Sequence, residues 1–388
     1  MQAFGILTYH YSYNEGAILQ AYALAQALKE HGAPGVEIID HRYPAKVAIY
    51  NRELDPRKRR LATAIDHWLP LSPRRFFDAD EKATWHYVCN RYRTLVIGSD
   101  QVWRTKYTSS WFGLRLTQSD HFVGRFPNVY WPPASLPVEK CSYAASIGDS
   151  RSQAIPRSHL VEMAKRLGDF RIIGVRDEQT AEFVERLSPS LRDRIYLCPD
   201  PTWLIDWRAH SCRGYSTLDK VSLIWSGRPS CLLAVNDTPL AHDLSKKLKE
   251  RGFAVIGYGS WDKYSAIKLY QWGLSLTEWI ALFGTVDICI TDRMHAFIFS
   301  IIGHCPCIVL DNGNKGAPCK SRLYDLCQRL EYPYRVDVTK DASEILHIAM
   351  SLTVDWAGID SRLSDYRRTG HQVLSEIVQR KRFGSEQQ

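Results

Sequence analysis

Residues 3–40 decide the fold, and they read AFGILTYHYSYNEGAILQAYALAQALKEHGAPGVEIID. Residues 3–8 form a short apolar run, which predicts a strand, and apolar residues then recur at helical spacing over 18–28. Gly32 ends the predicted helix, and residues 36–40 predict the next strand. A strand, a loop, a helix and a second strand in this order are the opening of a doubly wound α/β domain.

The same alternation of strands and helices continues along the chain, except over residues 206–229, where few apolar positions recur periodically. We therefore predict two Rossmann-like α/β domains that face each other across a cleft, with a C-terminal helix that crosses back to the first domain. The predicted boundaries are 1–205 for the first domain, 206–229 for a linker region, 230–355 for the second domain, and 356–388 for the helix and tail.

Composition narrows the classes of function. The chain has 388 residues, which favours two domains, and a formal net charge of +8. A positive charge suits an anionic substrate, an anionic membrane surface or nucleic acid. No nucleic-acid-binding motif is present, so we favour the first two and expect no nucleic-acid partner.

The cysteines and the N-terminus predict a cytoplasmic protein. The ten cysteines are scattered and several lie in apolar runs, which is typical of reduced, buried thiols. Cys305, Cys307 and Cys319 do not have the spacing of a zinc site, and we predict no metal and no cofactor. The sequence has no signal peptide and no apolar run of the ~20 residues that span a bilayer.

A basic stretch at 51–75 breaks the α/β rhythm. It holds seven Lys and Arg residues against three acids, with apolar side chains among them. One interpretation is an amphipathic helix that rests on the inner face of the cytoplasmic membrane. The alternative is a solvated helix whose apolar face packs on its own domain.

Polar residues directly after predicted strands are the candidate site residues, because ligands bind at the carboxyl ends of parallel strands. Arg293 and His295 follow the strand 286–291 and open a helix, whose N-terminus suits a phosphate or carboxylate. Arg293 adds a forked cation, and His295 can supply a proton near neutral pH. In the alternative reading Arg293 pairs with Asp292, and His295 is a structural histidine.

Two further strands end in charged residues. Arg176 is a second candidate anion clamp, or it forms a salt bridge with Asp177 or Glu178. Asp100 could accept a proton from a sugar hydroxyl, or it caps a helix. The chain has neither a Walker A motif nor a G-x-G-x-x-G after its first strand, which argues against an ATPase and a dinucleotide enzyme.

Seven segments in order resemble the polysaccharide pyruvyl transferase family. They lie within a span from residue 4 to about 325, and one departure is Leu276, where family members often have proline after serine. The motifs do not cover 51–75 or 121–138. The matching segments are 14–24, 97–103, 142–148, 175–178, 200–202, 277–279 and 291–296.

The resemblance implies a fold similar to GT-B glycosyltransferases, with the acceptor side on the first domain and the donor side on the second. It implies phosphoenolpyruvate as donor, a glycan or lipid-linked saccharide as acceptor, and a pyruvate ketal as product in cell-surface or exopolysaccharide synthesis. The implied roles are catalysis for His295 and Asp100, donor binding for Arg293 and Arg176, and acceptor or loop contacts for Asn14, Gly16, Trp103 and Ser146.

Three other functions stay open on the sequence. A GT-B-type glycosyltransferase would use a nucleotide-sugar donor, and residues 258–261, which read Tyr-Gly-Ser-Trp, could stack on its base. A non-catalytic subunit would only bind glycan or lipid-linked sugar. A transferase of the same family could use a small metabolite as acceptor.

Overall fold

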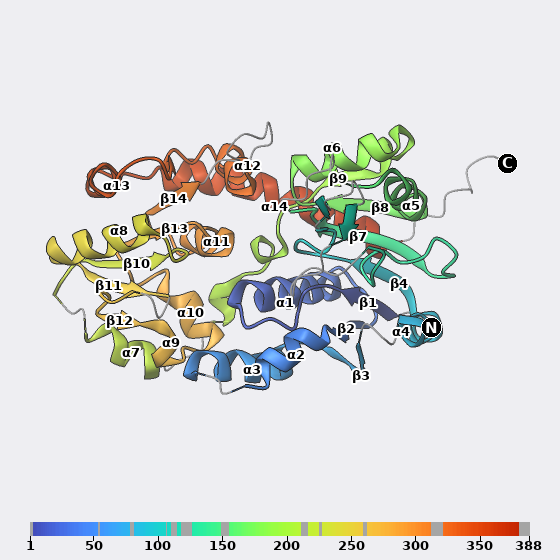
Figure 1. The fold of residues 1–388 in the computed structure, drawn as a ribbon, viewed down its shortest axis with the longest axis horizontal. Coiled ribbons are helices and arrows are strands. Elements are labelled where there is room, and N and C mark those ends of the chain that lie inside the picture. The colour runs from blue at the N-terminus through green and yellow to red at the C-terminus, as the bar shows by residue number, and fades with distance from the viewer. Residues whose placement is uncertain are drawn as a thin grey trace.

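The computed structural model contains two α/β domains, each built on a parallel sheet (Figure 1). It describes residues 3–52, 55–77, 81–105, 107–109, 115–117, 126–148, 155–210, 216–224, 227–258, 262–311 and 321–379. The predicted fold class, two Rossmann-like domains that face each other, is confirmed.

The first sheet has seven parallel strands in the order β3-β2-β1-β4-β7-β8-β9. The chain first winds outward from β1 and then returns to the other side of it, so the topological switch point lies between β1 and β4. The strands are β1 (Ala3–Leu7), β2 (Val36–Arg42), β3 (Leu71–Phe77), β4 (Tyr92–Ile97), β7 (Glu139–Ala145), β8 (Phe170–Val175) and β9 (Ile195–Leu197).

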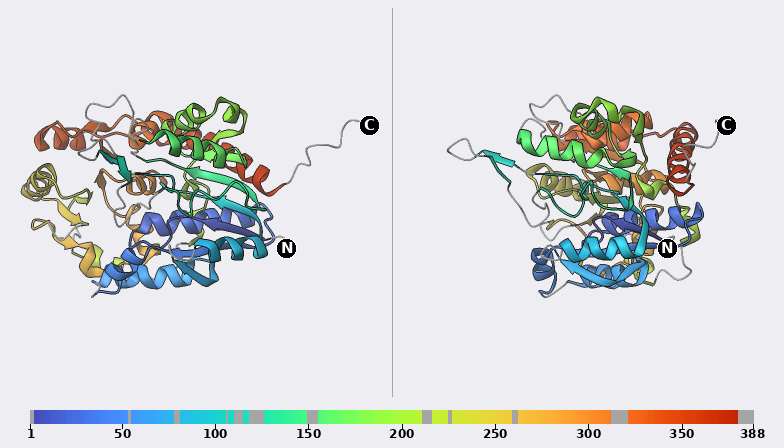
Figure 2. Two further views of the ribbon diagram at one scale, coloured as in Figure 1. Left: turned by 45° about the vertical axis from the view of Figure 1, so that its right-hand side comes forward. Right: turned by 90° about the vertical axis from the view of Figure 1, so that its right-hand side faces the viewer.

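Helices pack on this sheet, and a small antiparallel hairpin projects from the first domain (Figure 2). The hairpin is β5 (Tyr107–Ser109) with β6 (Arg115–Thr117). The helices are α1 (Glu15–Glu30), α2 (Pro44–Tyr50), α3 (Pro56–Trp68), α4 (Glu81–Arg91), α5 (Arg157–Leu167) and α6 (Glu178–Leu187), with 3₁₀ turns η3 (Pro189–Arg194), η4 (Pro201–Trp203) and η5 (Trp207–His210).

The second sheet repeats the same topology with six parallel strands in the order β12-β11-β10-β13-β14-β15. The strands are β10 (Ser230–Ala234), β11 (Ala254–Gly257), β12 (Ile267–Lys268), β13 (Ile288–Thr291), β14 (Cys307–Asp311) and β15 (Arg335–Asp337). The helices are α7 (Ser216–Ser222), α8 (Pro239–Glu250), α9 (Leu269–Trp272), α10 (Leu276–Leu282), α11 (Met294–Ile302), α12 (Arg322–Arg329) and α13 (Ala342–Met350).

The two domains share one hydrophobic core. Helix α1 is buried on most of its surface, because it lies between the first sheet and the second domain (Figure 1). Trp207 of η5 packs edge-on against Phe299 of α11, with ring centroids 5.5 Å apart. Continuous apolar packing of this kind holds the carboxyl ends of the two sheets toward each other.

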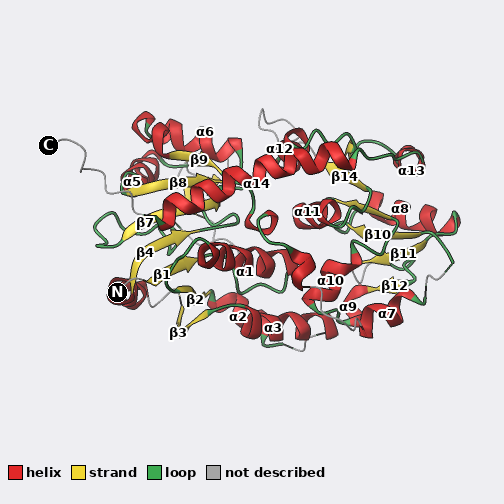
Figure 3. Cartoon of the chain, turned by 180° about the vertical axis from the view of Figure 1, so that it is seen from behind, coloured by secondary structure: helices red, strands yellow, loops and turns green. Residues whose placement is uncertain are grey.

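Helix α14 (Trp356–Val378) crosses from the second domain back to the first, as predicted (Figure 3). Near its start, His304 stacks on Trp356 at 4.7 Å. Near its end, the guanidinium of Arg171 donates to the carbonyls of Glu376 and Ile377, both at 3.0 Å. Residues 380–388, which include the predicted tail, lie outside the described residues.

The basic stretch forms α3 and most of β3, and its apolar side chains face inward. Leu61, Ala64 and Ile65 are buried in the core, and Trp68 packs against Tyr22 at 5.1 Å. This arrangement supports the reading in which α3 packs on its own domain. Among the described residues, no helix is long and apolar enough to cross a membrane.

The segment predicted as a linker region contains ordered elements, namely η5 and α7. The backbone N–H groups of Thr217 and Leu218 donate to the carboxylate of Glu278, at 2.8 and 3.1 Å. Glu278 also forms a capping box with Ser275, so α10 starts normally although Leu276 replaces the proline of the family pattern.

Candidate functional site

A polar pocket of about 400 Å³ lies where the two switch points meet. Its walls come from the loops after β1 and β4, from α2, and from the N-terminal ends of α1, α11 and α12. The lining residues are Tyr9, Ser12, Asn14, Glu15, Gly16, Ala17, Lys46, Asp100, Gln101, Arg104, Tyr258, Trp279, Asp292, Arg293, Met294, His295, Ala296 and Arg322. Five of the eight predicted site residues line this pocket, namely Asn14, Gly16, Asp100, Arg293 and His295, and Arg176 and Ser146 contact its lining through Asp100.

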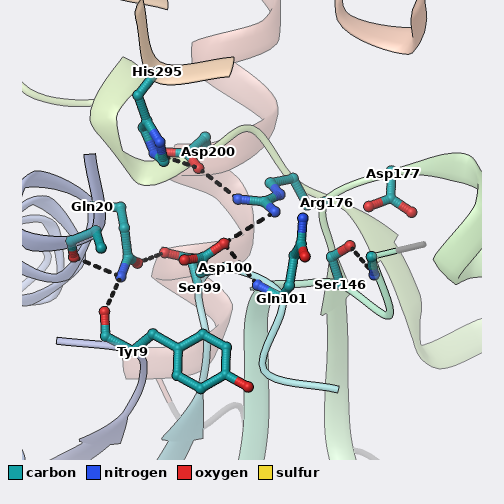
Figure 4. Close-up of polar contacts among 12 residues, drawn as sticks. Tyr9, Gln20, Ser99, Asp100, Gln101, Ser146, Arg176, Asp177, Asp200 and His295 are labelled. Atoms are coloured by element: carbon teal, nitrogen blue, oxygen red, sulfur yellow. Dashed lines mark hydrogen bonds and ion pairs between the residues drawn. The ribbon is translucent and has the colours of Figure 1, made fainter. Parts of the chain in front are cut away.

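His295 lies in the first turn of α11 and projects from the second domain toward the first (Figure 4). Its Nε2 atom is 3.6 Å from the Oδ2 atom of Asp200, and 16% of its side chain is exposed. The imidazole rests on Gly16, where an added Cβ would overlap it. Gly16 is therefore required at the start of α1 by close packing and not by its backbone angles.

Alternating charges continue from His295 into the first domain (Figure 4). Arg176 donates from Nη1 to Asp200 at 3.1 Å and from Nη2 to Asp100 at 3.3 Å. Burial alone would raise the pKa of Asp200, but His295, Arg176 and the hydroxyl of Thr202 lower it to well below its ordinary value. Asp200 is therefore ionised at neutral pH and can orient the imidazole.

Arg176 is not placed as the sequence analysis predicted. Its guanidinium is buried between two carboxylates and is absent from the pocket lining. Burial would lower its pKa, but Asp100, Asp200 and Asp177 raise it. The geometry favours the ion-pair reading, although the partners are Asp100 and Asp200, which are distant in sequence. Asp177 instead caps α6.

Asp100 lies on the turn after β4 and faces the pocket. Its backbone has a φ of 74°, in the left-handed region, where Asp is among the better tolerated residues. Its Oδ1 atom accepts from the backbone N–H of Gln101 at 2.8 Å. Arg176 therefore bridges this carboxylate and Asp200, and Asp200 in turn lies beside His295.

Arg293 is the N-cap residue of α11, and its guanidinium lies 5.3 Å from the ring centroid of Tyr258. Its Nη2 atom is 3.4 Å from the side-chain oxygen of Asn236. Asp292 accepts from the backbone and side-chain nitrogens of Asn236, at 3.0 and 2.8 Å. Burial raises the pKa of Asp292, whereas its hydrogen bonds with Asn236 and the charge of Arg293 lower it.

Asn14 lines the pocket, whereas Trp103 and Ser146 lie behind it. Trp103 is 1% exposed and donates to the carbonyl of Tyr130 at 3.1 Å. The backbone N–H of Ser146 donates to the carbonyl of Asp100 at 3.0 Å, and its own carbonyl accepts from Trp103. These two residues hold the Asp100 turn and do not line the pocket.

Sequence reasoning missed Asp200, Gln20 and Arg322. Asp200 comes shortly after β9, and the rule that selected Arg176 and Asp100 would also have selected it. Buried Gln20 donates to the carbonyl of Tyr9 at 3.1 Å, and its oxygen accepts from the hydroxyl of Ser99 (Figure 4). No periodic signal distinguishes Gln20, because it lies within the apolar face of α1.

Arg322 links the two domains across the pocket. It occupies the first turn of α12, and its guanidinium faces the side-chain amide of Gln101. In the orientation that satisfies both groups, the amide oxygen of Gln101 accepts from Arg322. The pocket is therefore bridged by side chains from both sides.

A second, larger cavity of about 790 Å³ lies between η5, α10, the C-terminal end of α11, and α14. It is lined mainly by apolar side chains such as Leu204, Ile280 and Leu363. None of the predicted site residues lines it, so the smaller polar pocket is the candidate active site.

Gly16→Ala is expected to lower turnover about a hundredfold, because a shift of ~1 Å at a catalytic group can cost that much. The added methyl group would displace the imidazole of His295. Steady-state kinetics would measure the effect. Gly35→Ala is the matched control, since its Cβ would meet Ala3 at an ordinary 3.7 Å. Equal activity of both variants would show that the imidazole position is unimportant.

Solved structures with a similar fold act on nucleotide sugars or polymerise teichoic acid. The Neisseria meningitidis UDP-GlcNAc 2-epimerase bound to UDP-GlcNAc has a TM-score of 0.56 and 8% identity, covering 97% of this chain and 98% of its own. The Methanocaldococcus jannaschii UDP-GlcNAc 2-epimerase has a TM-score of 0.55 and 9% identity, covering 96% and 98%. The wall teichoic acid polymerase TagF has a TM-score of 0.51 and 10% identity, covering 97% and 88%. At these identities the likeness concerns the fold alone.

The other two comparisons concern the sequence. No curated protein matches it significantly. Residues 14–314 match the family model described as Polysaccharide pyruvyl transferase, which is more than half of the chain.

Proposed function

The chain belongs to the polysaccharide pyruvyl transferase family, and from this premise we propose that it forms a pyruvate ketal on a saccharide hydroxyl pair with phosphoenolpyruvate as donor. The observation that carries the proposal is the first turn of α11. There Arg293 and His295 enter one pocket together, and His295 is backed by an ionised carboxylate, Asp200.

The proposed donor is a small dianionic to trianionic molecule, and the pocket suits such a ligand. The N-terminus of α11 offers backbone N–H groups and a partial positive charge, and Arg293 adds a forked cation. Lys46, Arg104 and Arg322 also line the pocket. Protein cations can stabilise the charge that develops on a phosphate leaving group.

The proposed reaction uses His295 as acid and Asp100 as base. His295 gives a proton to the methylene carbon of the donor, and the first acceptor hydroxyl attacks the neighbouring carbon while Asp100 takes its proton. The carbon–oxygen bond to phosphate then breaks as a phosphate oxygen takes the proton from Asp100, so hydrogen phosphate leaves. The second hydroxyl attacks the resulting oxocarbenium carbon and gives its proton to His295, which restores both side chains.

The main alternative is a glycosyltransferase with a nucleotide-sugar donor, as the bound ligand of the Neisseria enzyme illustrates. Tyr258, which the sequence analysis considered for base stacking, is 7% exposed. The guanidiniums of Arg57 and Arg293 lie over its ring, at 5.4 and 5.3 Å. This packing leaves little of the ring for a base and favours the pyruvyl donor. Residues 259–261 lie outside the described residues.

The cytoplasmic location and the use in cell-surface or exopolysaccharide synthesis belong to this proposal. Contact with an anionic membrane is a separate hypothesis. Arg59 and Arg60 are exposed on α3, which supports it, but the apolar side of α3 is committed to the core. Flotation with vesicles that contain or lack phosphatidylglycerol tests it, and equal flotation in both would end it.

A thermal-shift titration with phosphoenolpyruvate, UDP-GlcNAc and inorganic phosphate tests the donor. We expect phosphoenolpyruvate to raise the Tm selectively. Arg293→Gln is expected to weaken this binding about 10- to 100-fold, because a hydrogen bond to a charged group contributes ~1.5–3 kcal/mol. The matched control is Arg251→Gln, an exposed arginine in the same domain. A rise in Tm with UDP-GlcNAc alone would favour the glycosyltransferase. If Arg293→Gln binds phosphoenolpyruvate as tightly as wild type, Arg293 does not belong to the donor site.

A further inference from the structure

We propose that the loop from Tyr9 to Asn14 forms the acceptor subsite, and that it binds an uncharged saccharide longer than one ring. The inference rests on the proposed function, because it assigns the second substrate to a part of the same pocket. It is carried by the contrast between this uncharged loop and the cationic second-domain wall, and by the packed rings of Tyr11, Tyr13 and Tyr50.

The second-domain wall and the loop from Tyr9 to Asn14 differ in charge. The wall from the second domain carries Arg293 and His295 at a helix N-terminus, which suits an anionic donor. The first-domain wall also carries Lys46, Asp100 and Arg104, but its loop contributes Tyr9, Ser12 and Asn14, which are uncharged. Such hydroxyl, amide and aromatic groups are the kind that orient an uncharged polar ligand.

Glu15 also lines the first-domain wall, but its charge is already balanced. Arg57 donates to both of its carboxylate oxygens, at 2.6 and 2.5 Å. The side chain of Arg57 is largely buried, so this pair is held in place and does not compete for a ligand. Lys46 of the same wall lies 5.1 Å from the ring centroid of Tyr9.

Two polar groups of the loop have no protein partner among the described residues. The oxygen of the Asn14 side chain accepts from the backbone N–H of Ala17 at 3.2 Å, which leaves the amide nitrogen to donate elsewhere. The hydroxyl of Ser12 can both donate and accept. Two neighbouring sugar hydroxyls, vicinal or 1,3, could pair with these groups: one would accept from the amide nitrogen of Asn14, and the other would donate to or accept from the hydroxyl of Ser12.

The subsite is next to the catalytic imidazole. Asn14 caps α1, and Gly16, two residues later, contacts the ring of His295. A sugar hydroxyl held by Asn14 would therefore lie at the same end of α1 as the proposed acid. This places the acceptor hydroxyls beside the donor carbon that they are proposed to attack.

Aromatic rings extend the subsite beyond the pocket. Tyr13 stacks on Tyr50 of α2 at 3.8 Å, and the hydroxyl of Tyr50 accepts from the backbone N–H of Tyr13 at 3.2 Å. Tyr11 packs edge-on against Tyr50 at 5.4 Å. These half-buried rings hold one another rigid, and the apolar C–H groups of a sugar pack well against aromatic carbon. A second sugar residue would find such a surface here, whereas a small metabolite would not reach it.

The test is saturation-transfer NMR with methyl glycosides of glucose, galactose, mannose and N-acetylglucosamine, and with the corresponding tetrasaccharides. Replacing Ser12 by Ala and Asn14 by Ser together should weaken glycoside binding about tenfold through two lost hydrogen bonds. Serine still caps α1, so the fold is retained. Tyr13→Ala should weaken the tetrasaccharides more than the methyl glycosides. The matched control is Ser190→Ala with Asn90→Ser, both on the surface.

The outcomes separate this inference from the donor assignment. If wild type responds to phosphoenolpyruvate but binds no glycoside, or if the loop variants bind glycosides as wild type does, the subsite is wrong and the donor assignment stands. If glycosides bind through Ser12 and Asn14 while phosphoenolpyruvate has no effect, the subsite stands and the proposed donor is wrong. Equal losses for both sugar lengths in Tyr13→Ala would overturn the aromatic extension alone.

Discussion

His295→Gln is expected to lower kcat by about 10²–10⁴-fold, the range that general acid–base catalysis contributes. The phosphoenolpyruvate-induced rise in Tm should persist, because Arg293 and the N-terminus of α11 are retained. Glutamine keeps the approximate size of imidazole and can hydrogen-bond to Asp200, but it cannot deliver a proton at neutral pH. A selective loss of kcat would therefore assign proton transfer, and not donor binding, to His295.

Release of phosphate from phosphoenolpyruvate in the presence of the best-binding saccharide measures this effect. Incorporation of solvent deuterium at the methylene carbon of the donor reports the protonation step directly. His242→Gln is the control, since His242 is an exposed histidine of the same domain that pairs with Asp237. If His295→Gln keeps normal turnover and deuterium exchange, another group is the acid.

Arg176→Met is expected to lower the free energy of unfolding by about 3–5 kcal/mol, the cost of breaking a buried ion pair by removing one partner. Methionine fills much of the space but leaves Asp200 buried with one cation fewer. Urea denaturation at pH 7 measures the change. Arg192→Met is the control, because Arg192 is 74% exposed and its pair with Glu185 should contribute only ~0–1 kcal/mol.

The pH dependence of this effect has a defined direction. The pKa of Asp200 is depressed in the folded protein, so its ionisation stabilises the fold fully above its ordinary pKa. That stabilisation is lost as the pH falls toward the depressed value. The acid side of the stability profile should therefore flatten in Arg176→Met. If both arginine variants denature alike at pH 7, Arg176 does not hold the two carboxylates as described.

The fold could be predicted largely from the sequence because its signals are local. Apolar runs mark strands such as β13, and helical spacing marks α1. The order of these elements limits the chain to parallel sheets with their polar loops at the carboxyl ends. Arg293 and His295 were found by that rule alone, since both directly follow β13.

The roles of other motif residues could not be predicted, because a motif does not say which way a side chain points. Trp103 and Ser146 belong to segments that match the family, yet both turn inward and support the Asp100 turn. Asp200 also follows a strand and lies in a matching segment, but only its approach to His295 shows its role in the site.

Local sequence patterns are enough to predict the two α/β domains, the positions of the strand ends, and the place of Arg293 and His295 at the start of a helix. Which charged side chains pair with one another depends on how the two domains pack. Arg176 pairs with Asp200, 24 residues away, and with Asp100, 76 residues away, and His295 rests on a glycine of the other domain. The physical reason is range: periodicity and capping act within a few residues, whereas a buried charge is paired by whichever partner the packing of two domains brings to it.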